Sequence, residues 1–270
     1  MRRTGLHLLL AASLCTAAAP LPAQSLADRV GRTRDGAVRF QYPAHPDVCG
    51  LDESIVRFHE GGHGYSFTNF RGSSGVRDLS ADEMRARCRF GPAFVALELN
   101  GGQVERVRVR VGEPGSEPAT DLGAVSAAEA VEFLLGSAAR VVSRRSGDAL
   151  FAATIADTDW APAMLALATD RGVREETRRN AIFWTSQAAG ERAARGLHSI
   201  LSDDSEELEL RKHAVFALSQ QRSDQAVTAL LEVAEHSPEP EIRKAAFFWL
   251  GQKDEDPRVM ALFQRVLLDR

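Results

Sequence analysis

The sequence predicts a mainly α protein in which a small β-rich domain precedes a C-terminal α-solenoid of helical hairpins. Three observations predict this fold. Residues 1–23 form an apolar leader, residues 24–123 contain short segments of alternating apolar and polar residues, and residues 124–270 repeat a pattern every 32 or 33 positions. A period of two is typical of strands, and a repeat of this length with two helices per period is typical of a solenoid.

The first 23 residues have the layout of a secretory signal peptide. Arg2 and Arg3 form a short positive region, an apolar run covers residues 6–19, and small residues and prolines lead to Ala23, after which we expect cleavage. The weaker alternative is a membrane anchor, because the run is shorter than the ~20 residues that span a bilayer. We therefore expect an exported protein, periplasmic or secreted, that does not contact the membrane after cleavage.

The composition is that of an ordinary soluble protein. Of the 270 residues, 26% are charged, and the formal net charge is -4. A protein that binds nucleic acid is expected to have a basic face or a high pI. The charge balance therefore predicts no nucleic-acid partner.

Two cysteines, Cys49 and Cys88, remain after the predicted leader is removed. An even pair in an exported chain predicts one disulfide. It would close a loop of about 40 residues and stabilise the fold by about 3–4 kcal/mol. The alternative is a pair of free, buried thiols. Two lone cysteines 39 positions apart lack the ligand-pair spacing of a zinc site.

Alternating segments predict the strands of the β-rich domain. The predicted strands are 37–42, 54–58, 93–99 and 103–111. Asn100 and Gly101 between the last two predict a hairpin. In the return strand, valines and arginines occupy opposite faces, and the arginines are Arg106, Arg108 and Arg110. We interpret them as the solvated face of a half-exposed sheet; the alternative is an anion-binding surface.

The segment His59-Glu60-Gly61-Gly62-His63 matches the H-E-x-x-H pattern of zinc proteases. In such enzymes the two histidines bind zinc one helical turn apart, and the glutamate acts as the general base. The two glycines each disfavour a helix by about 1 kcal/mol, and the preceding residues are predicted to be a strand. The main interpretation is a plain turn, and a zinc-dependent hydrolase using His59, Glu60 and His63 is the alternative function.

The helical half begins with Ser126 and Glu129, which form a capping-box pattern and predict a helix to about Val142. Blocks of the form Ala-x-Phe then follow at intervals of 32, 33 and 32 residues. These blocks are Ala149-Leu150-Phe151, Ala181-Ile182-Phe183, Ala214-Val215-Phe216 and Ala246-Phe247-Phe248. Each is predicted to lie in the first helix of a hairpin, with its phenylalanine in the shared core. A Leu-rich segment follows in the second helix. Since one hairpin cannot bury its apolar face alone, about four hairpins are expected to stack.

Three of the first helices carry an acidic residue followed by a basic pair. The aligned blocks are Glu176-Thr177-Arg178-Arg179, Glu209-Leu210-Arg211-Lys212 and Glu241-Ile242-Arg243-Lys244. An acid in the first turn stabilises a helix through its dipole, so the glutamates have a structural explanation. Trp184 and Trp249 stand at equivalent positions, with Ala217 between them. Aromatic residues at helical spacing are usually core, and the alternative is a patch that anchors a partner.

The helical half resembles the short HEAT repeats of the phycobilisome-lyase type. The residues that carry the resemblance are 178–184, 211–218 and 242–251. With the leader and the β-rich segment before these repeats, the whole arrangement looks like exported HEAT-repeat proteins of bacteria. This resemblance implies a fold but no single function, because such repeats serve many roles. Di-iron hydroxylases with similar repeats place a His-Glu pair where this chain has Asn180-Ala181, His213-Ala214 and Ala245-Ala246. That departure argues against the same metal site.

The sequence therefore predicts an exported HEAT-repeat scaffold or adaptor that binds another protein, without catalysis and without a cofactor. We expect basic side chains to steer the partner and aromatic side chains to anchor it. The candidate binding residues are Arg178, Arg179, Trp184, Arg211, Lys212, Arg243, Lys244 and Trp249.

Overall fold

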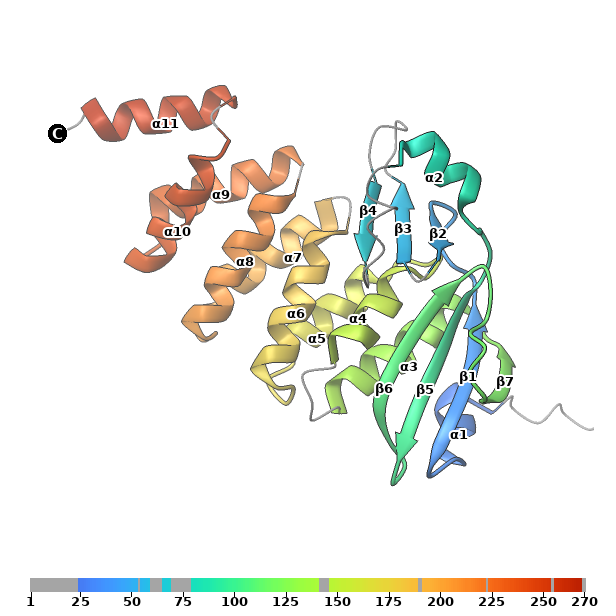
Figure 1. Ribbon diagram of the computed structural model, residues 1–270. Coiled ribbons are helices and arrows are strands. Elements are labelled where there is room, and N and C mark those ends of the chain that lie inside the picture. Colours follow the sequence, from blue (N-terminus) through green and yellow to red (C-terminus); the bar gives the residue numbers. More distant parts are fainter. Residues whose placement is uncertain are drawn as a thin grey trace, which may run out of the picture.

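The computed structural model describes residues 24–52, 54–58, 65–68, 79–140, 146–188, 191–221, 223–253 and 255–268. A β-rich region lies at one end of the molecule, and a row of helical hairpins extends from it (Figure 1). The predicted leader and the His59–His63 segment lie outside the described residues.

The larger sheet has four strands in the order β6-β5-β1-β7. Its strands are β1 (Gly36–Tyr42), β5 (Ala93–Asn100), β6 (Gln103–Val111) and β7 (Thr120–Ala124). The predicted hairpin is confirmed: Asn100 pairs with Gln103, and Gly101 and Gly102 between them have φ values of 59° and 80°. These left-handed conformations favour glycine. The sequence analysis missed β7, which runs parallel to β1.

A second, smaller sheet packs beside the first. It consists of β2 (Val48–Leu51), β3 (Ser54–Phe58) and β4 (Tyr65–Thr68), and the short helix α2 (Ala81–Arg87) covers it. The predicted disulfide is present and joins Cys49 on β2 to Cys88 at the end of α2. The bond and the buried side chains of Leu51, Phe58 and Met84 form a small core of their own.

A close backbone approach joins the two sheets. Gly50 on β2 exchanges two backbone hydrogen bonds with Arg89, of 3.0 and 2.8 Å. A Cβ atom at Gly50 would lie only 2.2 Å from the carbonyl oxygen of Val111 at the end of β6. Only glycine fits at this crossing, next to the disulfide.

Helix α3 (Ala127–Arg140) packs against the four-stranded sheet. Phe133 meets Phe40 of β1 edge to face, with ring centroids 5.9 Å apart. Ser126 caps the helix by accepting a hydrogen bond from the Glu129 backbone N–H. The Glu129 carboxylate does not close the predicted capping box. It accepts instead from the backbone N–H of Leu26, at the start of α1 (Leu26–Gly31).

Four helical hairpins follow, as the repeat pattern predicts. Their first helices are α4 (Ser146–Thr154), α6 (Glu175–Ser186), α8 (Leu208–Gln220) and α10 (Pro240–Leu250). Their second helices are α5 (Ala161–Thr169), α7 (Glu191–Ser202), α9 (Asp224–His236) and α11 (Pro257–Leu268). First helices contact first helices, and each of α5, α7 and α9 also packs against the next first helix. The aligned alanines allow this approach, since Ala149, Ala181, Ala214 and Ala246 are fully buried.

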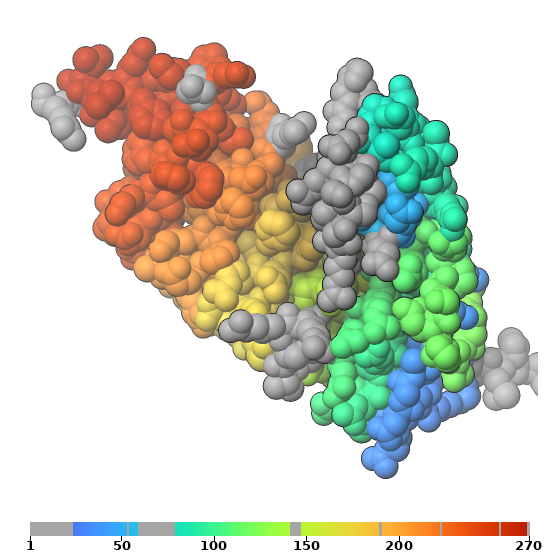
Figure 2. Space-filling view, in the orientation of Figure 1, coloured from blue at the N-terminus to red at the C-terminus, as the bar shows by residue number. Residues whose placement is uncertain are grey.

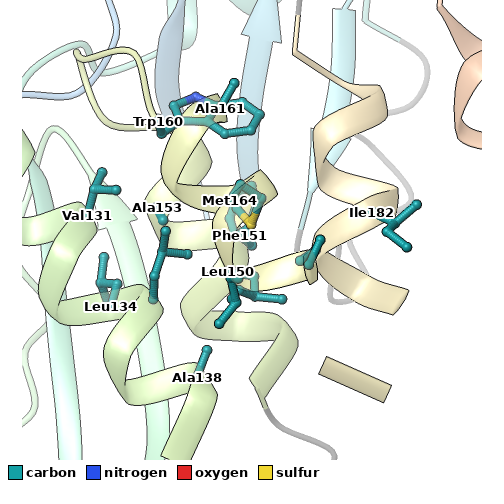
Figure 3. Packing of buried hydrophobic residues seen from close by; sticks show 14 of the residues in the cluster. Val131, Leu134, Ala138, Leu150, Phe151, Ala153, Trp160, Ala161, Met164 and Ile182 are labelled. Atoms are coloured by element: carbon teal, nitrogen blue, oxygen red, sulfur yellow. The ribbon is translucent and has the colours of Figure 1, made fainter. Parts of the chain in front are cut away.

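One apolar core extends from the large sheet through the hairpins. Figure 3 shows its centre, where Leu134 of α3, Leu150 of α4 and Met164 of α5 pack together. The buried hydroxyl of Tyr42 on β1 donates a hydrogen bond to the Ala152 carbonyl of α4, and burial raises the pKa of this phenol. The sheet therefore covers the apolar face of the first hairpin.

We predict that Gly50→Ala destabilises the fold by about 1–3 kcal/mol, because the added methyl group overlaps the Val111 carbonyl. Denaturant unfolding followed by circular dichroism measures the change. Gly31→Ala is the matched control, since a Cβ atom at Gly31 meets nothing within 4 Å. Equal stability of the Gly50→Ala variant and the wild type would contradict the close approach.

Candidate functional site

The first basic residue lies inside the molecule in two of the three aligned pairs. Arg178 is 3% exposed and Arg211 is 6% exposed. The Nε atom of Arg178 donates to the Ala168 carbonyl at 2.8 Å, and that of Arg211 donates to the Leu201 carbonyl at 2.9 Å. Both carbonyls belong to the last turn of the preceding second helix, where backbone acceptors lack intrahelical partners. The two arginines therefore cap α5 and α7.

Arg243 performs a related task in the fourth hairpin. Its guanidinium donates to the Ser237 carbonyl at 2.6 Å and to the Pro238 carbonyl at 3.2 Å. These acceptors directly follow α9, so this arginine also satisfies backbone oxygens at the end of a second helix. The arginine at this repeat position thus donates to carbonyl groups at the end of a second helix in three places.

Buried Arg178 also links its hairpin to the next one. Its guanidinium bonds the carboxylate of Glu206, which lies between α7 and α8 and whose side chain is 5% exposed. Burial alone would raise the pKa of Glu206. The hydrogen bonds from Arg178 and from the Glu207 N–H outweigh burial and leave that pKa below its usual value. Arg211 pairs with Asp204 at 2.8 Å, but that carboxylate is largely exposed.

The predicted binding role of Arg178 and Arg211 is therefore corrected. Neither side chain has enough exposed surface to contact a partner, and both are engaged inside the chain. Arg243 is half-buried and bonded in the same way.

The second basic residue of each pair is accessible to solvent. Arg179 pairs with Glu175 at 3.2 Å, and Lys212 pairs with Glu209 at 3.0 Å. Both pairs are partly exposed, where an ion pair contributes little stability. Lys244 is exposed and has no ion pair within the described residues. These three cations remain accessible to a partner.

The two tryptophans bridge neighbouring hairpins. Trp184 of α6 packs against Phe151 of α4 with ring centroids 5.5 Å apart, and Trp249 of α10 packs against Phe216 of α8 at 5.0 Å. Both indoles are half-buried against the core. Their main role is therefore structural, in line with the interpretation of helically spaced aromatic residues as core. The alternative, that they are free anchors for a partner, is not favoured.

The accessible aromatic side chains of the hairpins are two of the aligned phenylalanines and not the tryptophans. Phe183 is 41% exposed, because the residue that would cover it, one repeat later, is Ala217. Phe248 is 60% exposed. The sequence analysis placed the aligned phenylalanines in the shared core and missed this surface. Its signal is the spacing: Arg179 and Phe183, like Lys244 and Phe248, are four residues apart and share a helix face.

We call this surface the outer face. It comprises a basic residue and a phenylalanine on each of α6, α8 and α10, with a glutamine four residues after each phenylalanine, at or just beyond the end of the helix. Its members are Arg179, Phe183, Gln187, Lys212, Phe216, Gln220, Lys244, Phe248 and Gln252. All nine are half-buried or exposed. We refer to the basic, phenylalanine and glutamine positions as its three rows, and the same chemistry recurs in them on three neighbouring hairpins.

The arginines of β6 are already paired. Arg106 and Arg108 contact Glu98 at 3.3 and 2.7 Å, and Arg108 and Arg110 approach Glu117 at 3.6 and 3.9 Å. A cleft of about 280 Å³ beside them contains Arg87 and Arg89. These two face the carboxylates of Asp52 and Glu113. This mixed surface favours the interpretation as a solvated face over an anion site.

The alternative zinc site cannot be placed, because His59, Glu60 and His63 lie outside the described residues. Among the residues that the structure does describe, no cluster of three or more His, Cys, Asp or Glu side chains could hold a metal ion. Within the same residues, none of the helices is both long enough and apolar enough to cross a membrane.

Comparison with known families gives a match in the helical half. Residues 161–251 match the family model described as HEAT repeats. The matched segment begins with α5 and ends just after α10, so it includes the whole outer face except Gln252. No curated protein matches the chain. The match supports a HEAT-repeat protein.

We predict that Arg178→Ala lowers the free energy of unfolding by about 3 kcal/mol, because it leaves Glu206 buried without its partner and the Ala168 carbonyl without a donor. Arg179→Ala is the matched control one position away. It removes an exposed pair and should cost less than about 0.5 kcal/mol. Denaturant unfolding at pH 7 measures both values.

The stability that Arg178 contributes should depend on pH, and the direction of this dependence follows from the pKa of Glu206. The lowered pKa of Glu206 means that its contribution is present above the unfolded pKa and is lost as the pH falls through the folded pKa. The difference in unfolding free energy between wild type and Arg178→Ala should therefore become smaller below about pH 4. Similar losses in the two variants, or a gap that widens in acid, would contradict the assignment.

Proposed function

We propose that this chain is an exported scaffold protein, without catalysis or a cofactor, that binds another protein through the outer face of an α-solenoid. The observation that carries the proposal is the repetition of basic and phenylalanine side chains on α6, α8 and α10, each followed by a glutamine at or just beyond the end of the helix. The match to HEAT repeats supports it, since such repeats commonly mediate protein interactions.

The chemistry of the outer face suits a protein partner. Phe183 and Phe248 can bury apolar area, and aromatic side chains contribute strongly to interfaces. Arg179, Lys212 and Lys244 surround them with positive charge, which steers an acidic surface into register. Glutamine amides donate and accept hydrogen bonds, so the third row can pair with backbone groups of the partner.

Export is part of the proposal, and two further observations support it. The leader pattern in residues 1–23 is one. The other is the Cys49–Cys88 disulfide, which is stable in oxidising compartments such as the periplasm or the outside of the cell.

The experiment is crosslinking of the tagged full-length chain in its own cells, followed by identification of what co-purifies. The test variant reverses the three exposed cations to glutamate: Arg179→Glu, Lys212→Glu and Lys244→Glu. We predict one dominant partner in the wild type and at least about a tenfold loss in the variant.

The matched control is Arg192→Glu with Arg195→Glu. These arginines are exposed on α7, outside the outer face, and the control should retain the partner. Circular dichroism checks that both variants fold. No partner in the wild type, or equal recovery with the triple variant, would contradict the proposed function.

A further inference from the structure

A cavity of about 710 Å³ opens in the β-rich region and shares no lining residue with the outer face. It lies where β1 ends, where β2 and β5 begin, and where β7 leads into α3. Helices α10 and α11 lie at the opposite end of the molecule (Figures 1 and 2). Small-molecule sites in proteins typically have volumes of roughly 300–1,000 Å³, so the size of this cavity suits a small molecule.

One wall of the cavity is the segment that joins β1 to β2, and it is rigid. Pro43 and Pro46 fix their own φ angles. Hydrogen bonds tie the segment to the loop between α4 and α5: the His45 N–H donates to the Ile155 carbonyl at 2.8 Å, and the Asp157 N–H donates to the Pro43 carbonyl at 2.9 Å. A ligand therefore meets a wall that is already in place, which lowers the entropic cost of binding.

The walls offer few free hydrogen-bonding groups. Four carbonyl groups of lining residues already accept backbone hydrogen bonds of 2.9 or 3.0 Å. They belong to Gln41, Pro43, His45 and Pro92. The hydroxyl of Tyr42, another lining residue, is engaged with the Ala152 carbonyl. Since a polar group that is buried without a partner costs free energy, a ligand of this cavity must be mostly apolar.

The walls also lack a counter-charge for an ionic ligand. Among the described residues that line the cavity there is no Asp, Glu, Lys or Arg. The cleft beside β6 differs in this respect, because Arg87, Arg89 and Glu113 line it. Moving a charged group out of water without an opposite charge to receive it is strongly unfavourable. The cavity therefore favours a neutral ligand over an anion or a cation.

One polar side chain at the cavity, His45, can recognise a specific group. Its Nδ1 atom lies 2.6 Å from the Asp47 carboxylate and 3.4 Å from the Asp47 N–H. The shorter contact places a proton on Nδ1, so Nε2 of the neutral ring is an acceptor. Nε2 has no hydrogen bond to any residue that the structure describes, and the side chain is 49% exposed. A ligand hydroxyl or N–H group can donate to this atom.

Phe90 supplies an aromatic surface at the same cavity. Its side chain is 46% exposed, and no other large apolar side chain described in the β-rich region is as exposed. The ring stacks on Phe58 of β3, with centroids 6.3 Å apart and an angle of 27° between the planes. This contact holds the ring in place, and its free surface can cover a flat apolar ligand.

We propose that this cavity binds a neutral, mostly apolar small molecule that carries one hydroxyl or N–H group. The apolar body of the ligand packs between Phe90 and the wall formed by Pro43 and Pro46, and its polar group donates to Nε2 of His45. The site is independent of the outer face. The chain thus combines a small-molecule site in the β-rich region with a protein-binding surface on the hairpins.

The experiment is a fluorescence titration of the purified full-length chain with phenylnaphthylamine, a neutral aromatic molecule with one N–H group whose emission rises in apolar surroundings. Its sulfonated analogue, anilinonaphthalenesulfonate, has the same apolar body and a negative charge. We expect saturable binding of the neutral probe at one site. The anionic probe should bind at least about tenfold more weakly, because the walls hold no counter-charge.

Three variants locate the probe. Phe90→Ala removes the exposed ring, and Ala124→Trp fills the cavity from the end of β7, so each should weaken binding of the neutral probe by at least about tenfold. His45→Phe keeps a ring but removes the acceptor, and should weaken binding by about fivefold. Phe183→Ala is the matched control, an exposed phenylalanine on α6, and should bind like the wild type. Circular dichroism verifies the fold of each variant.

A wild type that does not bind the neutral probe, equal affinity for the two probes, or unchanged binding in both Phe90→Ala and Ala124→Trp overturns the proposal. Weaker binding in Phe183→Ala overturns the placement in the cavity, and unchanged binding in His45→Phe overturns the role of Nε2. Loss of the crosslinked protein partner in both cavity variants would assign the cavity to that partner and overturn the small-molecule assignment.

Discussion

The architecture depends on one constraint: a two-helix hairpin cannot bury its apolar face against itself. Each hairpin must find a neighbour, and the chain supplies one by repeating the same unit and by starting the row on a β-sheet. Tyr42 on β1 and the apolar side chains of α3 connect the sheet to the first hairpin. The core is consequently continuous, and the stability of one hairpin is tied to that of the next.

Where hairpins meet, polar side chains repeatedly donate hydrogen bonds to backbone carbonyl groups at the helix ends. Helix ends leave carbonyl groups without donors, and a joint hides them from water. Arg178 and Arg211 satisfy these acceptors. At the end of α6, the buried side-chain amide of Gln221 donates to the carbonyls of Thr185, Ser186 and Ala188. Basic residues that suggest a charged surface in the sequence are therefore divided between structure and surface, and only the second of each pair remains for binding.

Much of the fold could be predicted from the sequence, because the relevant signals are local or periodic. The hairpin at Asn100 and Gly101 and the four repeats follow from turn chemistry and from spacing. Strand β7 could not be predicted, since Thr120–Ala124 has no alternation. Its position depends on pairing with β1, which is distant in the sequence.

The division of each basic pair was predictable in principle. Arg178, Arg211 and Arg243 each stand three residues before the buried alanine of their block, so they share its face of the helix. Their neighbours Arg179, Lys212 and Lys244 stand four residues before a phenylalanine instead. What spacing could not show is that Phe183 and Phe248 are exposed, because this depends on Ala217 for Phe183 and on which described residues pack against α10 for Phe248.

Native-state hydrogen exchange along the whole chain tests the central claim, that the hairpins are stabilised in series from the sheet outward. The account predicts the strongest amide protection in α3, α4 and α6, with protection decreasing stepwise through α8 and α10 to α11. Adding Tyr42→Phe, which removes the bond to Ala152, should lower protection in α4 as well as in β1. Equal protection in every hairpin, or a β-region change confined to β1, would contradict it.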